Sequence, residues 1–527
     1  MESFAVPSPT RAERLALRVV QLGAIAVVLA ASLHRTFDLD RFLVPKELAL
    51  HATAALAGLF ALPSIRRSHF ARVDLLLIAF VGVSIAASLF AANPWLAFRA
   101  VAVSASSLLL FWTTRALREA GLARPLLSSL AFAIVLAAAT SLAQAYGLSL
   151  DLFSINRVPG GTLGNRNFVA HAAAFGLPVV LLAALHAQRA IGYLAASCGA
   201  AFVTAALVLT RSRAAWLAFG AVVMVFLVAI FFSSALRRDG RAWRRLLGVI
   251  VIAGAGVAAA LLLPNDLRWR SDNPYLESVQ GMANYQEGSG RGRLIQYERS
   301  LRLAASNPLL GVGPGNWPVA YPEFAKGNDP SMDQSEDGMT SNPWPSSDWV
   351  AYVAERGPAA ALLLAIAFLM IVTVAFRRLA SAVTAEDSLQ AMTLLGTLIA
   401  AGVAGAFDAV LLLALPSLFV WTALGVLWTP LESRSPALRS LVAPLLLVLC
   451  FAGAARSTAQ LIAMEIYAAS DTRSTLEMGS RIDPGNYRLR LRLARGGKRN
   501  DRCEHALAAR GLYPNARAAR NLARGCE

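Results

Sequence analysis

The chain has 527 residues, 56% hydrophobic and 15% charged, with a mean hydropathy of +0.53 and a formal net charge of +17. Soluble domains carry about 25% charged residues, so the composition excludes an ordinary soluble enzyme, and the long uncharged runs exclude a nucleic-acid-binding protein. A bilayer accepts a chain that is both apolar and basic, because its cytoplasmic loops collect Lys and Arg. We therefore predict an all-α, polytopic integral membrane protein.

Thirteen apolar segments approach the roughly 20 residues that a membrane-spanning helix needs. They predict about 12–13 transmembrane helices, at 15–33, 43–62, 73–92, 96–113, 126–146, 168–186, 191–210, 214–232, 246–263, 349–376, 388–408, 412–428 and 438–456. Pro416 and a very short turn divide the pair at 388–428. We thus expect four parts: an N-terminal membrane region of about nine helices, a long loop, further membrane helices and a tail, at 1–263, 264–347, 348–456 and 457–527.

The short connections between these segments differ in charge. With a cytoplasmic N-terminus, 19 Lys and Arg fall in inside connections, whereas 8 fall outside, namely Arg35, Arg41, Lys46, Arg99, Arg157, Arg166, Arg211 and Arg213. Because basic residues concentrate in cytoplasmic loops, this bias predicts an N-terminus inside. Thirteen crossings then place the long loop and the C-terminus outside.

The tail begins as a helix and then becomes polar. Its sequence Asp483-Pro484-Gly485-Asn486-Tyr487, followed by Ala-rich helical spacing, looks like a fragment of a tetratricopeptide repeat. A single repeat cannot bury its own face, so we expect the tail to pack on the membrane domain or to be incomplete. Cys503 and Cys526 either form a disulfide or remain free thiols. Residues 471–527 hold 13 Lys and Arg against 6 acids, which favours a cytoplasmic position, although domain-sized segments follow the charge rule poorly.

Three basic clusters fall on the predicted outer side, where an arginine at a membrane edge needs a reason. They are Asn165, Arg166 and Asn167 in a Gly-rich turn; Arg211 and Arg213 between two spans; and Arg291 and Arg293 in the long loop. Backbone N–H groups at a helix N-terminus favour anions, and arginine grips phosphate with a rigid fork of donors. The clusters predict an anionic, lipid-linked substrate such as a polyprenyl diphosphate. An ordinary Gly-rich loop and arginines that snorkel to headgroups are the alternatives.

The long loop is also rich in aromatic residues. Trp317, Tyr321, Trp344 and Trp349 are predicted either to stack on sugars or to anchor at the membrane interface. No His, Cys and acid set has metal-ligand spacing, and no nucleotide-binding loop is present. We therefore expect neither a metal nor a cofactor.

Taken in order, these residues resemble the O-antigen ligase and Wzy-type O-antigen polymerase superfamily. The matching pieces are Pro45-Lys46, Gly164-Asn165-Arg166-Asn167, Ser212-Arg213-Ala214-Ala215-Trp216, Gly292-Arg293 with Tyr297, Asn307-Pro308-Leu309-Leu310-Gly311-Val312-Gly313-Pro314-Gly315-Asn316, Asp348-Trp349, Ala354-Glu355-Arg356-Gly357 and Phe407-Asp408. They extend over residues 40–430, and the run at 307–316 is the most specific of them.

The resemblance implies a glycosyltransferase of the bacterial inner membrane with a periplasmic loop. The thirteen predicted crossings then put the C-terminus on the periplasmic side. Such enzymes move a glycan from undecaprenyl diphosphate to a lipid A-core or saccharide acceptor. Carried over to this sequence, Arg213 and Arg293 would hold the diphosphate and act in catalysis, with Arg211, Arg291 and Arg166 in support.

One departure from the family pattern concerns the general base. Family ligases usually carry a His just before the Asp-Trp pair, whereas here Ser346 and Ser347 precede Asp348. Asp348 is the natural substitute as base on the acceptor hydroxyl, with capping of the following helix as its alternative role. Two other functions stay open: a lipid-linked glycan transporter or exporter, and an inactive scaffold that holds polysaccharide-assembly proteins through its tail.

Overall fold

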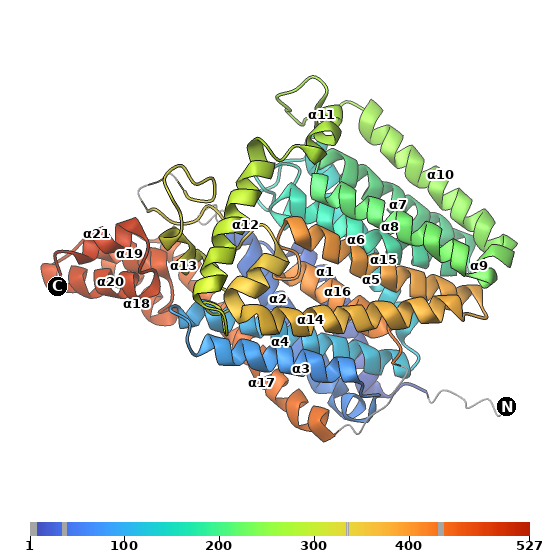
Figure 1. Ribbon diagram of the computed structural model, residues 1–527, viewed down its shortest axis with the longest axis horizontal. Helices are drawn as coiled ribbons and strands as arrows, with labels where there is room; N and C mark the ends of the chain where they lie inside the picture. Colours follow the sequence, from blue (N-terminus) through green and yellow to red (C-terminus); the bar gives the residue numbers. More distant parts are fainter. Residues whose placement is uncertain (1–7, 34–38, 334, 336, 431–436, 527) are drawn as a thin grey trace.

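The computed structural model describes residues 8–33, 39–333, 335, 337–430 and 437–526, and its elements are labelled in Figure 1. These residues form helices and one isolated antiparallel bridge between Met332 and Thr340, with no β-strand among them. Each predicted span coincides with a helix: α1 (Arg11–Leu29), α2 (Asp40–Arg67), α3 (Arg72–Ser88), α4 (Pro94–Glu119), α5 (Ala123–Ala145), α6 (Arg166–His186), α7 (Ala190–Leu209), α8 (Arg213–Phe232), α10 (Gly240–Leu262), α14 (Asp348–Ala380), α15 (Ala385–Phe407), α16 (Ala414–Leu427) and α17 (Ala437–Ala469).

Ten of these helices are long and apolar enough to cross a membrane, counting the described residues alone. The other three are α1, which carries four charged residues in its first half, α3 with 17 residues and α16 with 14. Apolar side chains such as Leu247, Ile250 and Val251 of α10 are exposed on the outside of the bundle, as expected of helices that face lipid. The chain is therefore an all-α, multi-pass membrane protein.

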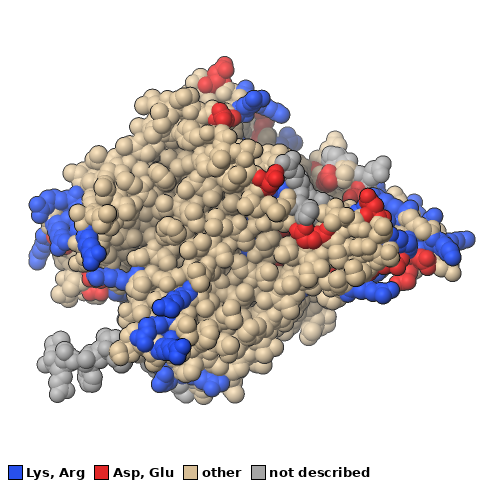
Figure 2. Space-filling view, turned by 180° about the vertical axis from the view of Figure 1, so that it is seen from behind, with Lys and Arg blue, Asp and Glu red and all other residues tan. Residues whose placement is uncertain are grey.

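The two ends of the helical bundle differ in charge. Residues 264–347 cover one end, here called the loop end, and the connections predicted to lie inside are gathered at the opposite end. That opposite end includes the five arginines around α9 (Ser234–Arg238), namely Arg237, Arg238, Arg241, Arg244 and Arg245. In Figure 2 a broad uncharged surface separates basic side chains at that end from mixed charges near the tail. Arg35 and Arg434 lie outside the described residues.

The long loop contains α11 (Pro274–Gln280), α12 (Gly288–Ser306), α13 (Trp317–Ala320) and three-residue 3-10 turns at Gly281–Ala283 and Tyr321–Glu323. Its turn at 307–316 packs against the first half of α14, where the Val312 N–H donates to the Ala354 carbonyl at 3.0 Å. Gly311 has a φ of +65°, and a Cβ there would lie 2.5 Å from the Ala354 carbonyl oxygen. The carboxylate of Glu355 accepts the N–H groups of Gly315 and Trp317. The family-like run at 307–316 therefore docks the loop on α14.

The tail forms two helix pairs, α18 (Arg473–Ile482) with α19 (Tyr487–Ala494) and α20 (Arg499–Leu512) with α21 (Arg517–Ala523). It packs at the loop end, as expected: Asn93 donates to the Leu512 carbonyl at 3.1 Å and Asn515 to the Val319 carbonyl at 3.2 Å. Cys503 and Cys526 form a disulfide. The loop and the tail thus share one side of the membrane.

Charge complementarity accompanies this docking. Residues 264–347 hold ten acids against seven basic residues, opposite to the excess of the tail, and Arg495 forms an ion pair with Asp337 at 3.2 Å. Asp329 of the loop does not take part in this charge complementarity, because it is 2% exposed and bonded to Arg299 and Tyr321.

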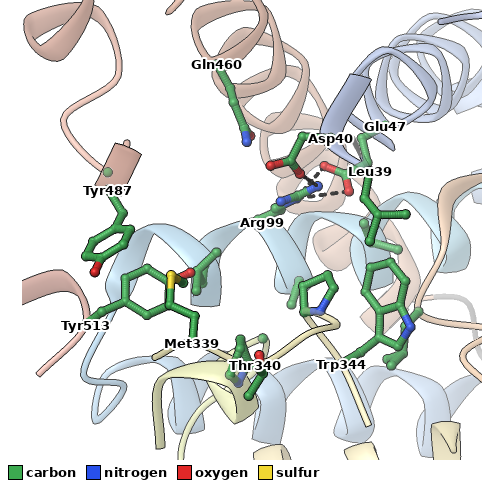
Figure 3. Close-up of a pocket in the computed structure, with 18 of the residues that line it drawn as sticks. Leu39, Asp40, Glu47, Arg99, Met339, Thr340, Trp344, Gln460, Tyr487 and Tyr513 are labelled. Atoms are coloured by element: carbon green, nitrogen blue, oxygen red, sulfur yellow. Dashed lines mark hydrogen bonds and ion pairs between the residues drawn. The ribbon is translucent and has the colours of Figure 1, made fainter. Parts of the chain in front are cut away.

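A cavity of about 550 Å³ lies between the tail, the loop and the ends of α2, α4 and α17 (Figure 3). Trp344 and Thr340 of the loop border it, and Tyr487 and Tyr513 of the tail close its outer side. Residues 411–413, between α15 and α16, line its inner side.

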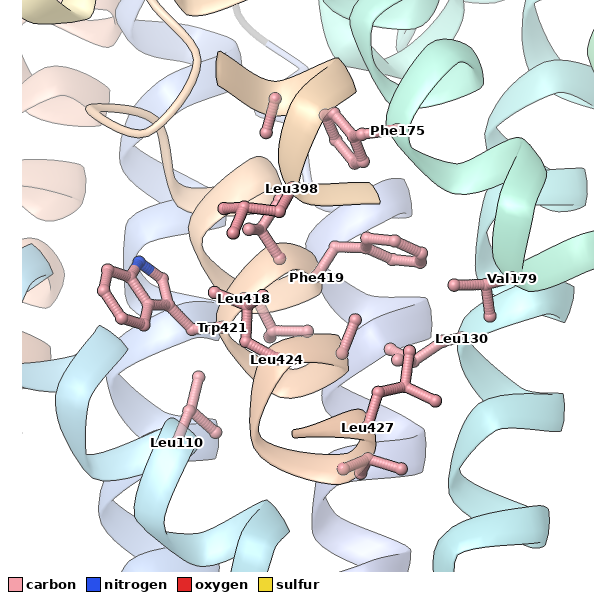
Figure 4. Close-up of a cluster of buried hydrophobic side chains, with 14 of the residues drawn as sticks. Leu110, Leu130, Phe175, Val179, Leu398, Leu418, Phe419, Trp421, Leu424 and Leu427 are labelled. Atoms are coloured by element: carbon pink, nitrogen blue, oxygen red, sulfur yellow. The ribbon is translucent and has the colours of Figure 1, made fainter. Parts of the chain in front are cut away.

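Helix α16 is the innermost helix, with all 14 of its residues buried. In Figure 4 its side chains Phe419, Trp421 and Leu424 point outward among residues of α4, α5, α6 and α15. At 1.5 Å per residue it spans about 21 Å, less than the roughly 30 Å of a hydrocarbon core. The non-helical segment 408–413 precedes it, and irregular backbone inside a membrane must be buried and hydrogen-bonded.

Candidate active site

The N-terminus of α6 brings two of the predicted basic clusters together. Asn165 caps the helix, since its side chain accepts the Asn167 N–H at 3.0 Å. The Arg166 guanidinium lies 5.0 Å from the ring centre of Trp269, and the Arg211 guanidinium lies 4.7 Å from the same ring. A single indole of the long loop therefore holds arginines from the starts of α6 and α8, at distances where cation–π attraction acts.

The pair Arg211 and Arg213 is held by the loop in different ways. Arg211 donates to the Ser278 hydroxyl at 2.9 Å and pairs with Glu277 at 3.1 Å. Arg213 donates to the Gly281 carbonyl. A carbonyl neutralises no charge, so Arg213 keeps its positive charge unpaired, whereas Arg211 is matched by a carboxylate.

The third basic cluster lies on α12. Arg293 is half-buried, and its guanidinium makes no hydrogen bond or ion pair with any group in the described part of the chain. It acts electrostatically on Tyr297 and on His171. Burial raises the pKa of the Tyr297 hydroxyl to about 12, so this hydroxyl stays protonated and donates to the carbonyls of Ser346 and Ala406 at 2.6 and 2.9 Å. Arg291 is exposed.

A carboxylate faces this cluster from the end of α15. Asp408 accepts a hydrogen bond from the Asn167 amide at 3.2 Å and lies 3.9 Å from His171 Nε2. Its side chain is 16% exposed, whereas His171 is buried with neither ring nitrogen hydrogen-bonded. Asp408, His171 and Asn167 thus meet at a point where the charge of Arg293 is felt.

The sequence interpretation missed this arrangement, because His171 reads as a packed histidine within a span and Asp408 as part of a family-like dipeptide. One signal was available: Asn167 and His171 are four residues apart, so they share a face of α6. Nothing in the sequence alone indicates that Asp408 lies opposite that face.

Asp348, the expected general base, has a different environment. It is fully buried at the start of α14, and its two carboxylate oxygens accept the N–H groups of Val410 and Leu411 at 2.9 and 2.8 Å. The structure therefore uses Asp348 to hold the non-helical segment 408–413 in place, and Ser347, not Asp348, caps α14. Both oxygens are directed at the protein backbone, which leaves the base role without geometric support.

The four aromatic candidates do not lie on one surface. Trp317 and Tyr321 are fully buried and stack on each other with ring centres 4.4 Å apart. Trp349 packs inside the bundle and donates to the Gly402 carbonyl at 3.2 Å. Trp344 alone among the four lines the cavity, beside Phe168 of α6. We correct the sugar-stacking expectation accordingly: Trp317, Tyr321 and Trp349 offer no ring face at the cavity.

The positive charge of this region comes from arginine side chains. Within the described residues, no group of three or more His, Cys, Asp or Glu side chains is placed to hold a metal ion. The contacts described above involve four guanidinium groups, of Arg166, Arg211, Arg213 and Arg293, and two carboxylates, of Glu277 and Asp408. The excess of positive charge suits an anionic group of a substrate.

One comparison with known protein families found a match that includes most of these arginines. Residues 198–365 match the family model described as Wzy_C, O-Antigen ligase. This segment includes Arg211, Arg213, Arg291, Arg293 and Asp348, and it ends before Asp408. No curated protein matches the chain. The segment 198–365 of this chain is therefore similar to the O-antigen ligase family.

Proposed function

We propose that this protein transfers a glycan from undecaprenyl diphosphate to a lipid or saccharide acceptor at the periplasmic face of the inner membrane. The similarity of residues 198–365 to the O-antigen ligase family supports a transferase of ligase or polymerase type. The observation that carries the proposal is the guanidinium of Arg293, which has no hydrogen bond or ion pair among the described residues and acts electrostatically on His171 and Tyr297. A charged donor without a protein acceptor is what a diphosphate requires.

In the proposed reaction, an acceptor hydroxyl oxygen attacks the anomeric carbon of the glycan. The bond from that carbon to the phosphate oxygen breaks, and undecaprenyl diphosphate leaves with the electron pair. Arg293 and Arg213 stabilise the negative charge that develops on the leaving group, and Arg211, Arg166 and the exposed Arg291 support its binding. A single displacement inverts the configuration at the anomeric carbon.

The acceptor proton goes to Asp408 in this scheme. Its carboxylate is partly exposed and oriented by Asn167, whereas Asp348 is buried and holds the following backbone. A carboxylate within hydrogen-bond reach of the acceptor serves as general base. We therefore assign the reacting carboxylate to Asp408 and a positioning role to Asp348.

The proposed orientation follows the charges of the bundle. The opposite end holds the basic connections, and such connections stay in the cytoplasm. The loop end, with Arg213, Arg293 and the tail, then faces the periplasm. The disulfide between Cys503 and Cys526 supports this side, because disulfides persist in the periplasm and are rare in the cytosol.

The decisive experiment compares Arg293→Ala with Arg302→Ala in the purified full-length protein. Arg302 lies on the same helix, is 59% exposed and pairs with Glu298, so its loss removes an arginine but not the site. The donor is an undecaprenyl-diphosphate-linked oligosaccharide, offered with lipid A-core or with a second donor molecule, and products are resolved by mass spectrometry. These two acceptors separate ligase from polymerase activity.

We expect Arg293→Ala to reduce transfer about 10²- to 10³-fold, as when one preorganised donor to a transition-state oxyanion is removed. Arg302→Ala should retain the wild-type rate. Equal rates in both variants, with both proteins folded by thermal unfolding, would contradict the proposal.

A further inference from the structure

The cavity beneath the tail has a different charge balance from the arginine cluster. Six carboxylates and four guanidinium groups line it. Three of the four arginines form hydrogen bonds to the protein: Arg99 to Glu47 at 2.7 Å, Arg356 to the hydroxyl of Ser104 at 2.8 Å, and Arg456 to Gln460. Figure 3 shows Arg99 between Asp40 and Glu47. Because the carboxylates outnumber the guanidinium groups, no surplus of positive charge remains for a diphosphate.

The lining groups suit a neutral, hydroxyl-rich molecule instead. Carboxylates accept hydrogen bonds from hydroxyl groups, while the amides of Gln460 and Asn486 both donate and accept. The rings of Trp344, Tyr487 and Tyr513 supply apolar faces with polar edges. The volume of about 550 Å³ falls within the range of about 300–1,000 Å³ that is typical of small-molecule sites.

Two chain segments connect the cavity to the candidate active site. One runs from Trp344, which lines the cavity, to Ser346, whose carbonyl accepts the Tyr297 hydroxyl. The other runs from Leu411, which lines the cavity, back to Asp408. The inner wall of the cavity is therefore continuous with the residues around Arg293.

We infer that this cavity binds the non-anionic saccharide of the acceptor, and that the C-terminal tail forms the wall that selects it. The inference rests on the proposed function and adds a substrate class and a specificity element to it. The tail lies outside the matched segment 198–365, so acceptor choice belongs to a part of the chain beyond the matched domain.

Binding, not activity, provides the test. The probes are neutral oligosaccharide methyl glycosides of two to four residues, built from glucose, galactose, mannose or N-acetylglucosamine, and inorganic pyrophosphate as the anionic probe. Calorimetry on the full-length protein in detergent compares wild type with Thr340→Trp, which fills the cavity from the loop, and Tyr513→Ala, which removes part of the tail wall. Lys326→Trp places the same indole on an exposed loop position outside the cavity and is the matched control.

We expect at least one oligosaccharide to bind, with an affinity reduced tenfold or more in Thr340→Trp and Tyr513→Ala and unchanged in Lys326→Trp and Arg293→Ala. Pyrophosphate should show the reverse pattern, with binding weakened by Arg293→Ala alone. Absence of binding by every oligosaccharide, or binding unaffected by both cavity variants, would overturn the inference.

The two proposals fail separately. If Arg293→Ala loses transfer but the wild-type protein binds no oligosaccharide, the proposed transferase reaction is supported and the proposed acceptor site beneath the tail is contradicted. Oligosaccharide binding that depends on Thr340 and Tyr513, together with full transfer by Arg293→Ala, would retain the saccharide site and remove the proposed reaction.

Discussion

The arginine cluster and the cavity beneath the tail both lie at the loop end, and both contain several guanidinium groups. In the cluster, Arg293 has no protein acceptor among the described residues and Arg213 has one carbonyl. In the cavity, Arg99, Arg356 and Arg456 are bonded to groups of the protein itself. The number of arginines by itself therefore does not identify an anion site; an excess of arginines over neighbouring carboxylates does.

The same distinction separates two carboxylates that lie close together. Asp348 is fully buried and binds the N–H groups of Val410 and Leu411, whereas Asp408 accepts the Asn167 amide and the N–H of its neighbour Ala409 and is 16% exposed. Exposure, rather than residue type, marks Asp408 as the proposed reacting group. Three changes in the chain probe this comparison.

The largest expected effect belongs to Asp408→Asn. The amide is close in shape to the carboxylate but cannot take a proton, so transfer should fall about 10²- to 10⁴-fold, the usual contribution of a general base. Rates with the undecaprenyl-diphosphate-linked donor measure this loss, and pyrophosphate binding should be retained. A rate within threefold of wild type would contradict Asp408 as the general base.

A smaller effect is expected for Asp348→Asn. The asparagine side chain would direct its NH₂ group at one of the two backbone N–H groups that Asp348 now binds, so that one hydrogen bond is lost. A hydrogen bond to a charged group contributes about 1.5–3 kcal/mol. Because about 1.4 kcal/mol corresponds to a factor of ten, transfer should fall about 10- to 100-fold through displacement of Asp408, and the unfolding temperature should fall as well. A lost rate with an unchanged unfolding temperature would instead indicate a direct chemical role for Asp348.

The smallest expected effect on transfer follows from the double change Cys503→Ser and Cys526→Ser. The disulfide closes a segment of 23 residues, and such a link stabilises a fold by about 2–4 kcal/mol, chiefly by constraining unfolded chain. We expect the tail alone to loosen, so KM for the acceptor should rise a few-fold while pyrophosphate binding stays unchanged. Hydrogen exchange in α20 and α21 measures the loosening directly, and a change in kcat with constant acceptor KM would argue against a tail wall.

Much of the fold could be predicted from local patterns. The spans could be predicted from apolar runs because each spanning helix must cross the same hydrocarbon core, which takes about 20 apolar residues. The concentration of basic residues at one end follows from the sequence of the short connections, because Lys and Arg favour the cytoplasmic side in each short loop independently. Arg211 and Arg213 could be singled out for the same reason, since a very short connection leaves two arginines at the loop end.

Other features depended on the path of the whole chain. Asn167 and Asp408 are 241 residues apart, and they meet because the buried segment 408–413 precedes α16 inside the bundle. The sequence predicted that Trp317 and Tyr321 stack on sugars, but the chain that follows the turn at 307–316 buries both rings in the core of the loop.

The sequence by itself determined that this is a basic, multi-pass helical membrane protein with a segment similar to O-antigen ligases, because hydropathy, charge bias and family-like runs act over short stretches. The tertiary structure alone decided which arginines are unpaired, which aspartate is exposed and that the tail closes a cavity. Each of those properties depends on which side chains, far apart in the sequence, lie close together in space. Tertiary packing determines these contacts, and composition does not.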